Sequence, residues 1–216
     1  LGHLDRDARG QRPQHGAGFR MSIVTLVSGG LDSTLVACLA KEEGLHQYPL
    51  FVDYGQRARE RELAACRSAM TRLGLPDPQV AELSGYGRLI RSGLTDTGLR
   101  VIEDAFTPGR NMLFLLTAAA HAMQMNADAV SIGLLHEDTS LFPDQTTAFL
   151  ADAEQMIERC MGRRIRVLAP LSMFHKHEVV ELARSKGISG TYSCHLGGAT
   201  PCMDCISCNE FKFKEN

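Results

Sequence analysis

The sequence lacks both long hydrophobic runs and a strong charge of either sign. No stretch approaches the roughly 20 consecutive apolar residues that cross a bilayer, and the first residues contain no apolar segment of the signal-peptide kind. The formal charge is −2, and the evenly spread lysines and arginines form no cluster of the type that binds nucleic acid phosphates. We therefore expect a soluble cytoplasmic protein that acts on a small molecule, without a membrane span or direct contact with nucleic acid.

The cysteines do not indicate a disulfide framework. Four of the seven crowd into the C-terminal end at metal-ligand spacing, and Cys38, Cys66 and Cys160 are scattered singly. This usage fits an intracellular chain, in which the single cysteines are small core residues. With 216 residues and 44% hydrophobic content, the chain can fill one core but is too short for two ordinary domains.

The chain divides into three segments by composition. Residues 1–20 hold four arginines and almost no apolar periodicity, which predicts a disordered N-terminal extension. Residues 21–188 are strongly patterned and are expected to form one domain. Residues 189–216, which we call the cysteine tail, have few apolar residues outside their cysteines.

Apolar patterning within 21–188 predicts an α/β fold. Short apolar runs predict strands at 23–27, 48–52, 80–83, 129–132 and 165–168. Helical spacing predicts a first helix that ends near Gly44, followed by helices at 56–73, 111–125, 144–161 and 175–186, whereas 84–109 is glycine-rich and has no clear period. Strands that alternate with helices predict a parallel five-stranded sheet with helices on both faces.

The segment Ser28–Thr34 reads SGGLDST and joins the first predicted strand to the first predicted helix. Glycines let backbone N–H groups turn toward a ligand, and the helix N-terminus adds the positive end of its dipole, so this segment suits an anion such as pyrophosphate. It lacks the lysine end of the Walker loop and the spacing of the dinucleotide fingerprint, which disfavours kinases and dehydrogenases. A structural turn with glycine at positive φ and a serine cap is the alternative.

Four cysteines in the tail predict a metal site. Cys194, Cys202, Cys205 and Cys208 are separated by seven, two and two residues, and such gaps let four thiolates surround one tetrahedral ion. Four protein ligands leave no open position for a substrate, which favours a structural zinc that stabilises the tail. An iron–sulfur cluster is the alternative, because the last three cysteines have ferredoxin-like gaps.

The segment Ser28–Thr34 resembles the PP-loop of the ATP pyrophosphatase superfamily, and we call it the PP-loop from here on. Further motifs follow in the order of the 7-cyano-7-deazaguanine synthase family, and the resemblance covers about 22–208. These motifs are DYGQR at 53–57, PGRN at 108–111, DTSLFPD at 138–144, KHE at 176–178 and the four cysteines. The resemblance implies an adenine nucleotide alpha hydrolase-like fold.

The same resemblance implies an activity. Members of the family adenylate 7-carboxy-7-deazaguanine with ATP, convert it with ammonia to the amide, and dehydrate the amide in a second ATP-dependent step to 7-cyano-7-deazaguanine, a precursor of queuosine. ATP, Mg²⁺ and Zn²⁺ are then the expected cofactors, AMP and pyrophosphate the released products, and a homodimer the expected assembly.

The resemblance also carries expected residue roles. The expected catalytic residues are Asp32, Ser33, Arg110 and Lys176. The expected ATP-binding residues are Ser28, Gly29, Gly30, Leu31, Asp32, Ser33, Thr34, Asp53, Tyr54 and Arg110. The expected substrate-binding residues are Asp138, Ser140, Phe142, Pro143 and Asp144. For Asp32 and Asp144, a helix-terminal role that satisfies the dipole or caps the following helix is the structural alternative.

Departures from the family pattern leave two alternative functions open. Ser140–Gln145 reads SLFPDQ where the family has SGYPDC, and Ala58 stands where the family has histidine. These changes favour, as an alternative, a diverged PP-loop ligase that acts on another deazaguanine-type carboxylate or attaches it to another molecule. A non-catalytic nucleotide-binding subunit is the second alternative. His136, His175 and His177 fit no local ligand spacing and are interpreted as surface or capping residues.

Overall fold

The computed structural model describes residues 21–211, so the predicted extension at 1–20 lies outside the described residues. The strands are β1 (Ser22–Leu26), β2 (His46–Asp53), β3 (Gln79–Glu82), β4 (Ala129–Ser131) and β5 (Arg166–Leu168). The helices are α1 (Leu31–Glu42), α2 (Arg59–Leu73), α3 (Ser84–Leu89), α4 (Arg110–Gln124), α5 (Thr147–Met161), α6 (Lys176–Ser185) and α7 (Ile206–Asn209). Two 3-10 turns, η1 (Glu137–Thr139) and η2 (Pro143–Gln145), follow β4.

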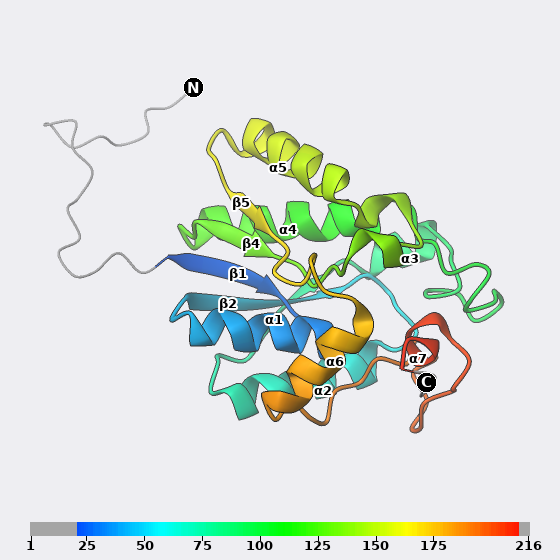
Figure 1. Cartoon of the computed structure of the whole chain (residues 1–216). Coiled ribbons are helices and arrows are strands. Elements are labelled where there is room, and N and C mark those ends of the chain that lie inside the picture. The colour runs from blue at the N-terminus through cyan, green and yellow to red at the C-terminus, as the bar shows by residue number, and fades with distance from the viewer. Residues whose placement is uncertain (1–20, 212–216) are drawn as a thin grey trace, which may run out of the picture.

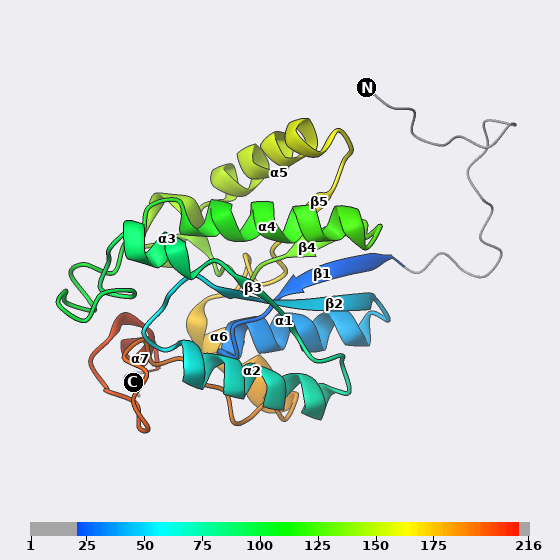
Figure 2. The same cartoon turned by 180° about the vertical axis from the view of Figure 1, so that it is seen from behind.

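The strands form one parallel sheet in the order β3-β2-β1-β4-β5. Helices α1, α2 and α6 cover one face, and α4 and α5 cover the other (Figures 1 and 2). This arrangement confirms the predicted five-stranded parallel sheet with helices on both faces. It follows from the continuous apolar runs of the central strands, which must be buried on both sides.

The main core packs β1 against α4, which presents several alanines to the sheet. Val24 of β1 and Leu115 of α4 are fully buried in the same cluster. Ala118, Ala119 and Ala122 on α4 are also fully buried, and their small size lets the helix lie close to the sheet. On the opposite face, Phe51 of β2 packs with the apolar side of α2.

Three features differ from the predictions, and the first is that the helix expected at 56–73 begins only at Arg59. The helix expected at 144–161 begins only at Thr147, because η2 precedes it and the Thr146 hydroxyl accepts a hydrogen bond from Phe149 N at 3.2 Å. The stretch 84–109 contains α3, whose sequence has two glycines and no apolar period. Gly87 fixes this helix against β2 by donating its N–H to Tyr54 O at 2.9 Å, a long-range contact that local patterning does not reveal.

None of the described helices is both long enough and apolar enough to span a membrane.

Candidate active site and metal centre

A pocket of about 290 Å³ opens at the carboxyl edge of the sheet. The sheet order changes direction between β1 and β4, since β2 follows β1 on one side and β4 lies on the other. In doubly wound sheets, the loops that leave such neighbouring strands diverge and leave a crevice for ligands. The PP-loop, the start of α4, the segment after β4 and the cysteine tail all contribute to the lining.

The PP-loop is closed by its own hydroxyl groups. Ser33 Oγ accepts a hydrogen bond from Ser28 N at 3.0 Å and lies 3.0 Å from Ser28 Oγ. Thr34 Oγ1 donates to Gly30 O at 2.8 Å. Gly30 is the N-cap of α1 and makes no side-chain cap to the first-turn amides. Residues 30–33 line the pocket, and an uncapped helix N-terminus suits an anion.

Gly29 is the position where the PP-loop requires glycine. Its φ is +81°, and a Cβ atom there would lie 2.4 Å from Glu62 O and 2.6 Å from Cys66 N. Both atoms belong to the backbone of α2, which cannot move aside as a side chain would. The glycine therefore serves close packing of the loop on α2 as well as the turn itself.

Asp32 and Lys176 are brought together from α1 and α6. Lys176 Nζ lies 2.8 Å from Asp32 Oδ1 and 3.0 Å from Glu210 Oε2 of the cysteine tail. Burial acts to lower the pKa of Lys176, but the two carboxylates outweigh it and raise that pKa. The ammonium is thus held charged behind the PP-loop, where its side chain is only 10% exposed. Asp32 and Glu210 line the pocket, whereas Lys176 does not.

Arg110 lines the pocket from the first position of α4. Its guanidinium carbon lies 5.8 Å from the Tyr54 ring centroid and 5.9 Å from that of Phe114. Gly109 precedes it with φ of +74° and turns the chain into the helix. A guanidinium held between aromatic rings at a pocket wall is placed to bind phosphate or carboxylate oxygens.

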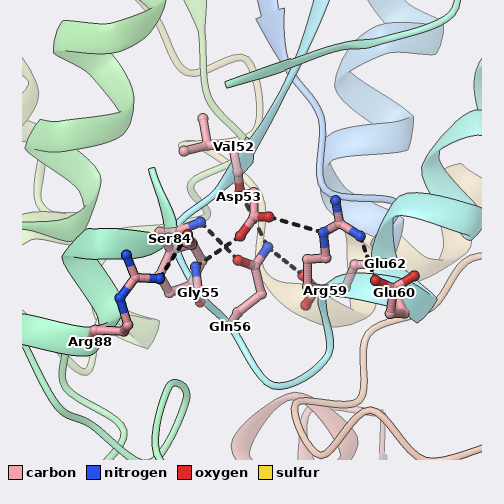
Figure 3. A network of polar contacts seen from close by, with 10 residues as sticks. Val52, Asp53, Gly55, Gln56, Arg59, Glu60, Glu62, Ser84 and Arg88 are labelled. Carbon is pink, nitrogen blue, oxygen red and sulfur yellow. Dashed lines mark hydrogen bonds and ion pairs between the residues drawn. The ribbon is translucent and has the colours of Figure 1, made fainter. Parts of the chain in front are cut away.

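Asp53 supports the site from outside the pocket. Asp53 Oδ1 accepts from Gly55 N and Oδ2 from Arg59 Nε, both at 3.0 Å (Figure 3). Its side chain is only 12% exposed and is occupied by these partners, which fix the turn from β2 into α2. Of the two predicted ATP-binding residues here, Tyr54 lines the pocket and Asp53 does not.

The predicted substrate segment places one of its five residues at the pocket. Phe142 lines the cavity and lies 5.1 Å from Phe106, centroid to centroid. Asp144 Oδ2 instead accepts from Asn111 N at 3.2 Å, and Asp144 O accepts from Asn111 Nδ2 at 2.8 Å. Asp144 therefore caps α4, a different helix from the one that follows it in sequence. The remaining three, Asp138, Ser140 and Pro143, do not line the pocket.

Several pocket residues were not predicted from the sequence, among them two titratable side chains. Glu62 of α2 and His195 of the cysteine tail both line the cavity. Burial, reinforced by Arg110 and Lys176, lowers the pKa of His195 to about 4, and its Nδ1 atom is buried without a hydrogen-bond partner among residues 21–211. Glu62 sits on a helix rich in charged residues that resembles an ordinary solvated surface, so no local signal distinguishes it.

The four tail cysteines converge on one point. Their sulfur atoms all lie within 4.8 Å of one another, and Cys202 Sγ is 3.8 Å from Cys208 Sγ. Cys205 N donates to Cys202 Sγ at 3.2 Å, and Cys202 N donates to Cys194 Sγ at 3.4 Å. Although burial opposes it, N–H donation from Asp204 and Cys205 lowers the pKa of Cys202 to about 7. The cluster fits a metal ion such as zinc.

Comparison with known proteins identifies the family. A sequence model described as "Queuosine biosynthesis protein QueC" matches residues 22–213. The chain belongs to the QueC family. It is 34% identical over 200 residues to "7-cyano-7-deazaguanine synthase 2" of Desulfitobacterium hafniense (strain Y51), covering 86% of this chain and 84% of that one. Other relatives at 31–32% identity carry the name 7-cyano-7-deazaguanine synthase.

Solved structures support the fold. NMN synthetase from Francisella tularensis matches with a TM-score of 0.54 at 17% identity, over 86% of this chain and 71% of that one. The U34-tRNA thiolase NcsA from Methanococcus maripaludis, with its [4Fe-4S] cluster, matches with a TM-score of 0.53 at 14% identity over 81% of this chain. The QueC-family chain spans 59% of that thiolase's length. At these identities the likeness confirms the PP-loop fold alone.

In this QueC-family chain the cysteine tail forms part of the pocket wall. Tyr192 N donates to Gly29 O at 2.9 Å, which joins the tail to the PP-loop. Gly197, at φ of +74°, lies against the backbone of Arg57 and Ala58. Several tail residues line the cavity, namely Tyr192, Ser193, His195, Ile206, Ser207 and Glu210. The tail that the metal is predicted to stabilise therefore also forms part of the candidate active site.

Histidines that are distant in sequence also meet near the site. His136, Asp138 and His175 offer ligand atoms within 4.8 Å of one another, and the two imidazole centroids lie 4.5 Å apart. His136 follows β4 and His175 caps α6. Because the two are 39 residues apart in sequence, local spacing could not predict their contact. The Asp138 side chain in this group is 75% exposed.

Proposed function

We propose that this QueC-family protein converts 7-carboxy-7-deazaguanine and ammonia to 7-cyano-7-deazaguanine at the expense of ATP. A first ATP adenylates the acid, which ammonia converts to the amide, and a second ATP drives the dehydration of the amide to the nitrile, with release of AMP and pyrophosphate. The observation that carries the proposal is the pocket itself: an open helix N-terminus at the PP-loop and the Arg110 guanidinium line one cavity. The names of the relatives supply the substrate class.

In this proposal the PP-loop binds the pyrophosphate portion of ATP. The first-turn amides of α1 and the Ser33 hydroxyl stabilise the negative charge that accumulates as the carboxylate attacks the α-phosphate. Mg²⁺, when bound, would neutralise part of the phosphate charge. Asp32 faces the pocket and its Lys176 partner holds it in place, while Arg110 binds the acid or the α-phosphate from α4.

The deazaguanine ring is proposed to stack at the aromatic side of the pocket. Phe142 lines this side and packs on Phe106, and such an aromatic wall suits a planar heterocycle. The contacts predicted for Asp138, Ser140, Pro143 and Asp144 rest on the family resemblance alone. Because Leu141 also lines the pocket, the altered segment supports, as the second candidate, a ligase for a related deazaguanine acid.

The cysteine cluster is proposed to hold one structural Zn²⁺. A tetrahedral ion with Zn–S bonds of about 2.3 Å sets its sulfurs about 3.8 Å apart, in agreement with the 3.8 Å between Cys202 and Cys208. A polynuclear iron–sulfur cluster places an inorganic core between its thiolates, which therefore stand farther apart. We further propose a cytoplasmic location and a homodimeric assembly for the protein.

The test is a product assay on purified protein. With Mg-ATP, ammonium and 7-carboxy-7-deazaguanine, we expect AMP, pyrophosphate and the nitrile. Asp32→Ala and Ser33→Ala should each lower AMP formation by roughly 100-fold or more while the circular dichroism spectrum stays unchanged. ADP as the product would exclude PP-loop chemistry. Turnover of a different deazaguanine acid alone would select the second candidate, and ATP binding without turnover of any acid would indicate a non-catalytic subunit.

A further inference from the structure

Glu62 is a carboxylic acid at the pocket that has no ionic partner among the described residues, 21–211. It stands one turn into α2, directly beside the part of the helix against which Gly29 packs. In the described part of the chain, three acidic side chains line the pocket, and the other two, Asp32 and Glu210, are both paired with Lys176. Within residues 21–211, no lysine, arginine or histidine lies within ion-pair distance of Glu62.

The Glu62 carboxyl group is held in place by a rigid amide. Gln56 Nε2 donates to Glu62 Oε2 at 3.1 Å (Figure 3). Gln56 is itself fixed, because its Oε1 accepts from Tyr54 N at 2.9 Å and its Nε2 also donates to Val52 O at 3.2 Å. The side chain of Gln56 is therefore a fixed support that orients one oxygen of the Glu62 carboxyl group at the pocket wall.

The surroundings disfavour the charged form of Glu62. Burial raises the pKa of Glu62 to about 7, against the opposing effects of the Gln56 hydrogen bond and the Arg110 charge. The titratable groups that face it are Arg110 from α4, Tyr54 after β2, Tyr192 from the cysteine tail and Cys66 on its own helix. Such a position is costly for a residue that has only a structural role.

We propose that Glu62 forms an ammonium subsite in this pocket and accepts a proton from the bound ammonium. This inference rests on the proposed function. The carboxylate takes one proton from NH₄⁺, and the ammonia so formed attacks the acyl carbon of the adenylate. A C–N bond forms and the C–O bond to AMP breaks, with the electron pair leaving on AMP. The second proton passes from nitrogen to water, and nothing is oxidised or reduced.

A magnesium ion is a less suitable occupant of this subsite. Mg²⁺ requires six oxygen ligands in near-ideal geometry. Glu62 has an amide donor and a guanidinium among its neighbours, and the pocket carboxylates of Asp32 and Glu210 are already paired with Lys176. Ammonium needs fewer contacts and can surrender a proton. The anion-binding side of the pocket, formed by the PP-loop and Arg110, is then complemented by a separate cation subsite.

The experiment compares two nitrogen nucleophiles in Glu62→Gln. Hydroxylamine is uncharged at neutral pH and forms a hydroxamate from the same adenylate, so it does not require an ammonium subsite or a proton acceptor before attack. We expect kcat/KM for ammonia to fall roughly 100-fold or more, with an increased KM for ammonium, and kcat/KM for hydroxylamine to fall about tenfold less. Glu60→Gln is the matched control, because Glu60 is on the same helix and its side chain is 84% exposed. Glu60→Gln should retain both rates.

Equal losses with both nucleophiles, no loss with either, or a changed Mg²⁺ requirement in place of a changed ammonium KM would overturn the assignment. If Glu62→Gln does not fold, Glu62→Asp provides the same comparison, and its selective loss of ammonia use decides the question. Failure of the wild-type protein to form AMP from the deazaguanine acid is a different result. That outcome would refute the proposed function and is seen before any variant is measured.

Discussion

The PP-loop and the cysteine tail line the same pocket but are specified in different ways. The PP-loop is local: its hydroxyls bond to its own backbone, and Ser33 and Ser28 lie five residues apart in sequence. The tail reaches the PP-loop from about 160 residues away, because Tyr192 N donates to Gly29 O. Its Glu210 also pairs with Lys176, the partner of Asp32. A local motif can be recognised from its amino-acid sequence, whereas the contribution of the tail to the pocket depends on long-range contacts that form only in the folded chain.

The comparison also separates two kinds of stabilisation. The PP-loop rests on a large sheet and on close packing against α2. The apolar cluster around the cysteine tail is small: Cys194, Cys205 and Cys208 are its buried members, and Val101 is the contribution from outside the tail. A segment with so little core depends on its metal for a defined position. The two regions should therefore respond differently to substitution.

The largest expected effect comes from removing a tail ligand. Cys205 is fully buried among the other three sulfurs, so Cys205→Ser should abolish metal retention and lower the free energy of unfolding by about 3 kcal/mol or more. Because the tail forms part of the pocket wall, AMP formation should also fall by roughly 100-fold. Metal analysis, thermal unfolding and the product assay measure these three quantities.

Cys160→Ser is the matched control for this substitution, since Cys160 is an exposed cysteine outside the cluster. It should leave metal content, stability and turnover unchanged. If Cys205→Ser lost its metal yet kept full activity, the tail would be a separate stabilising element and would not contribute to the pocket.

Sequence patterning predicted the parts of the molecule that are periodic or local. The five strands, the PP-loop and the cysteine cluster all follow from short-range patterns, and their positions agree with the structure to within a few residues. Patterning could not show that Asp144 caps α4, because its partner Asn111 lies 33 residues away. The pocket side chain of Glu62 was missed for a similar reason: helical spacing gives its helix a charged face, but does not say which charge is buried.

A second test asks how tightly the PP-loop is packed. Gly29→Ala places a methyl group 2.4 Å from Glu62 O at φ of +81°, and should lower the free energy of unfolding by at least about 3 kcal/mol, since steric conflict adds to left-handed strain. Gly44→Ala is the matched control: φ is +70° and nothing lies within 4 Å of its added Cβ. It should cost only about 1–2 kcal/mol. Equal costs in urea unfolding would show that close packing on α2 is unimportant.

A third test uses the pH dependence of stability to examine Glu62, which lies on α2 where the PP-loop packs. The pKa of Glu62 is raised from 4.5 to about 7 in the folded protein, so the folded state holds this proton more tightly than the unfolded chain. The carboxyl group therefore costs no stability below pH 4.5, and destabilises the protein increasingly as pH rises through 7. Glu62→Gln mimics the protonated form and should be more stable than wild type by about 3 kcal/mol at pH 8, with little difference at pH 4.5. Urea unfolding at both pH values measures this, and a pH-independent difference would contradict the raised pKa.

The smallest expected effect concerns the charge that the tail places near the PP-loop. Glu210→Gln removes one of the two carboxylates that pair with Lys176 and leaves Asp32 in place. Because the Glu210 side chain is 39% exposed, solvent screens the pair and the loss of stability should be below about 1 kcal/mol. The pKa of Lys176 should fall toward its ordinary value, since burial then opposes a single carboxylate.

Glu42→Gln is the control, because it removes a comparably exposed carboxylate that pairs with Lys186 away from the pocket. If both variants lose equal stability but only Glu210→Gln weakens ATP binding, then the tail acts on the PP-loop through charge as well as through its position.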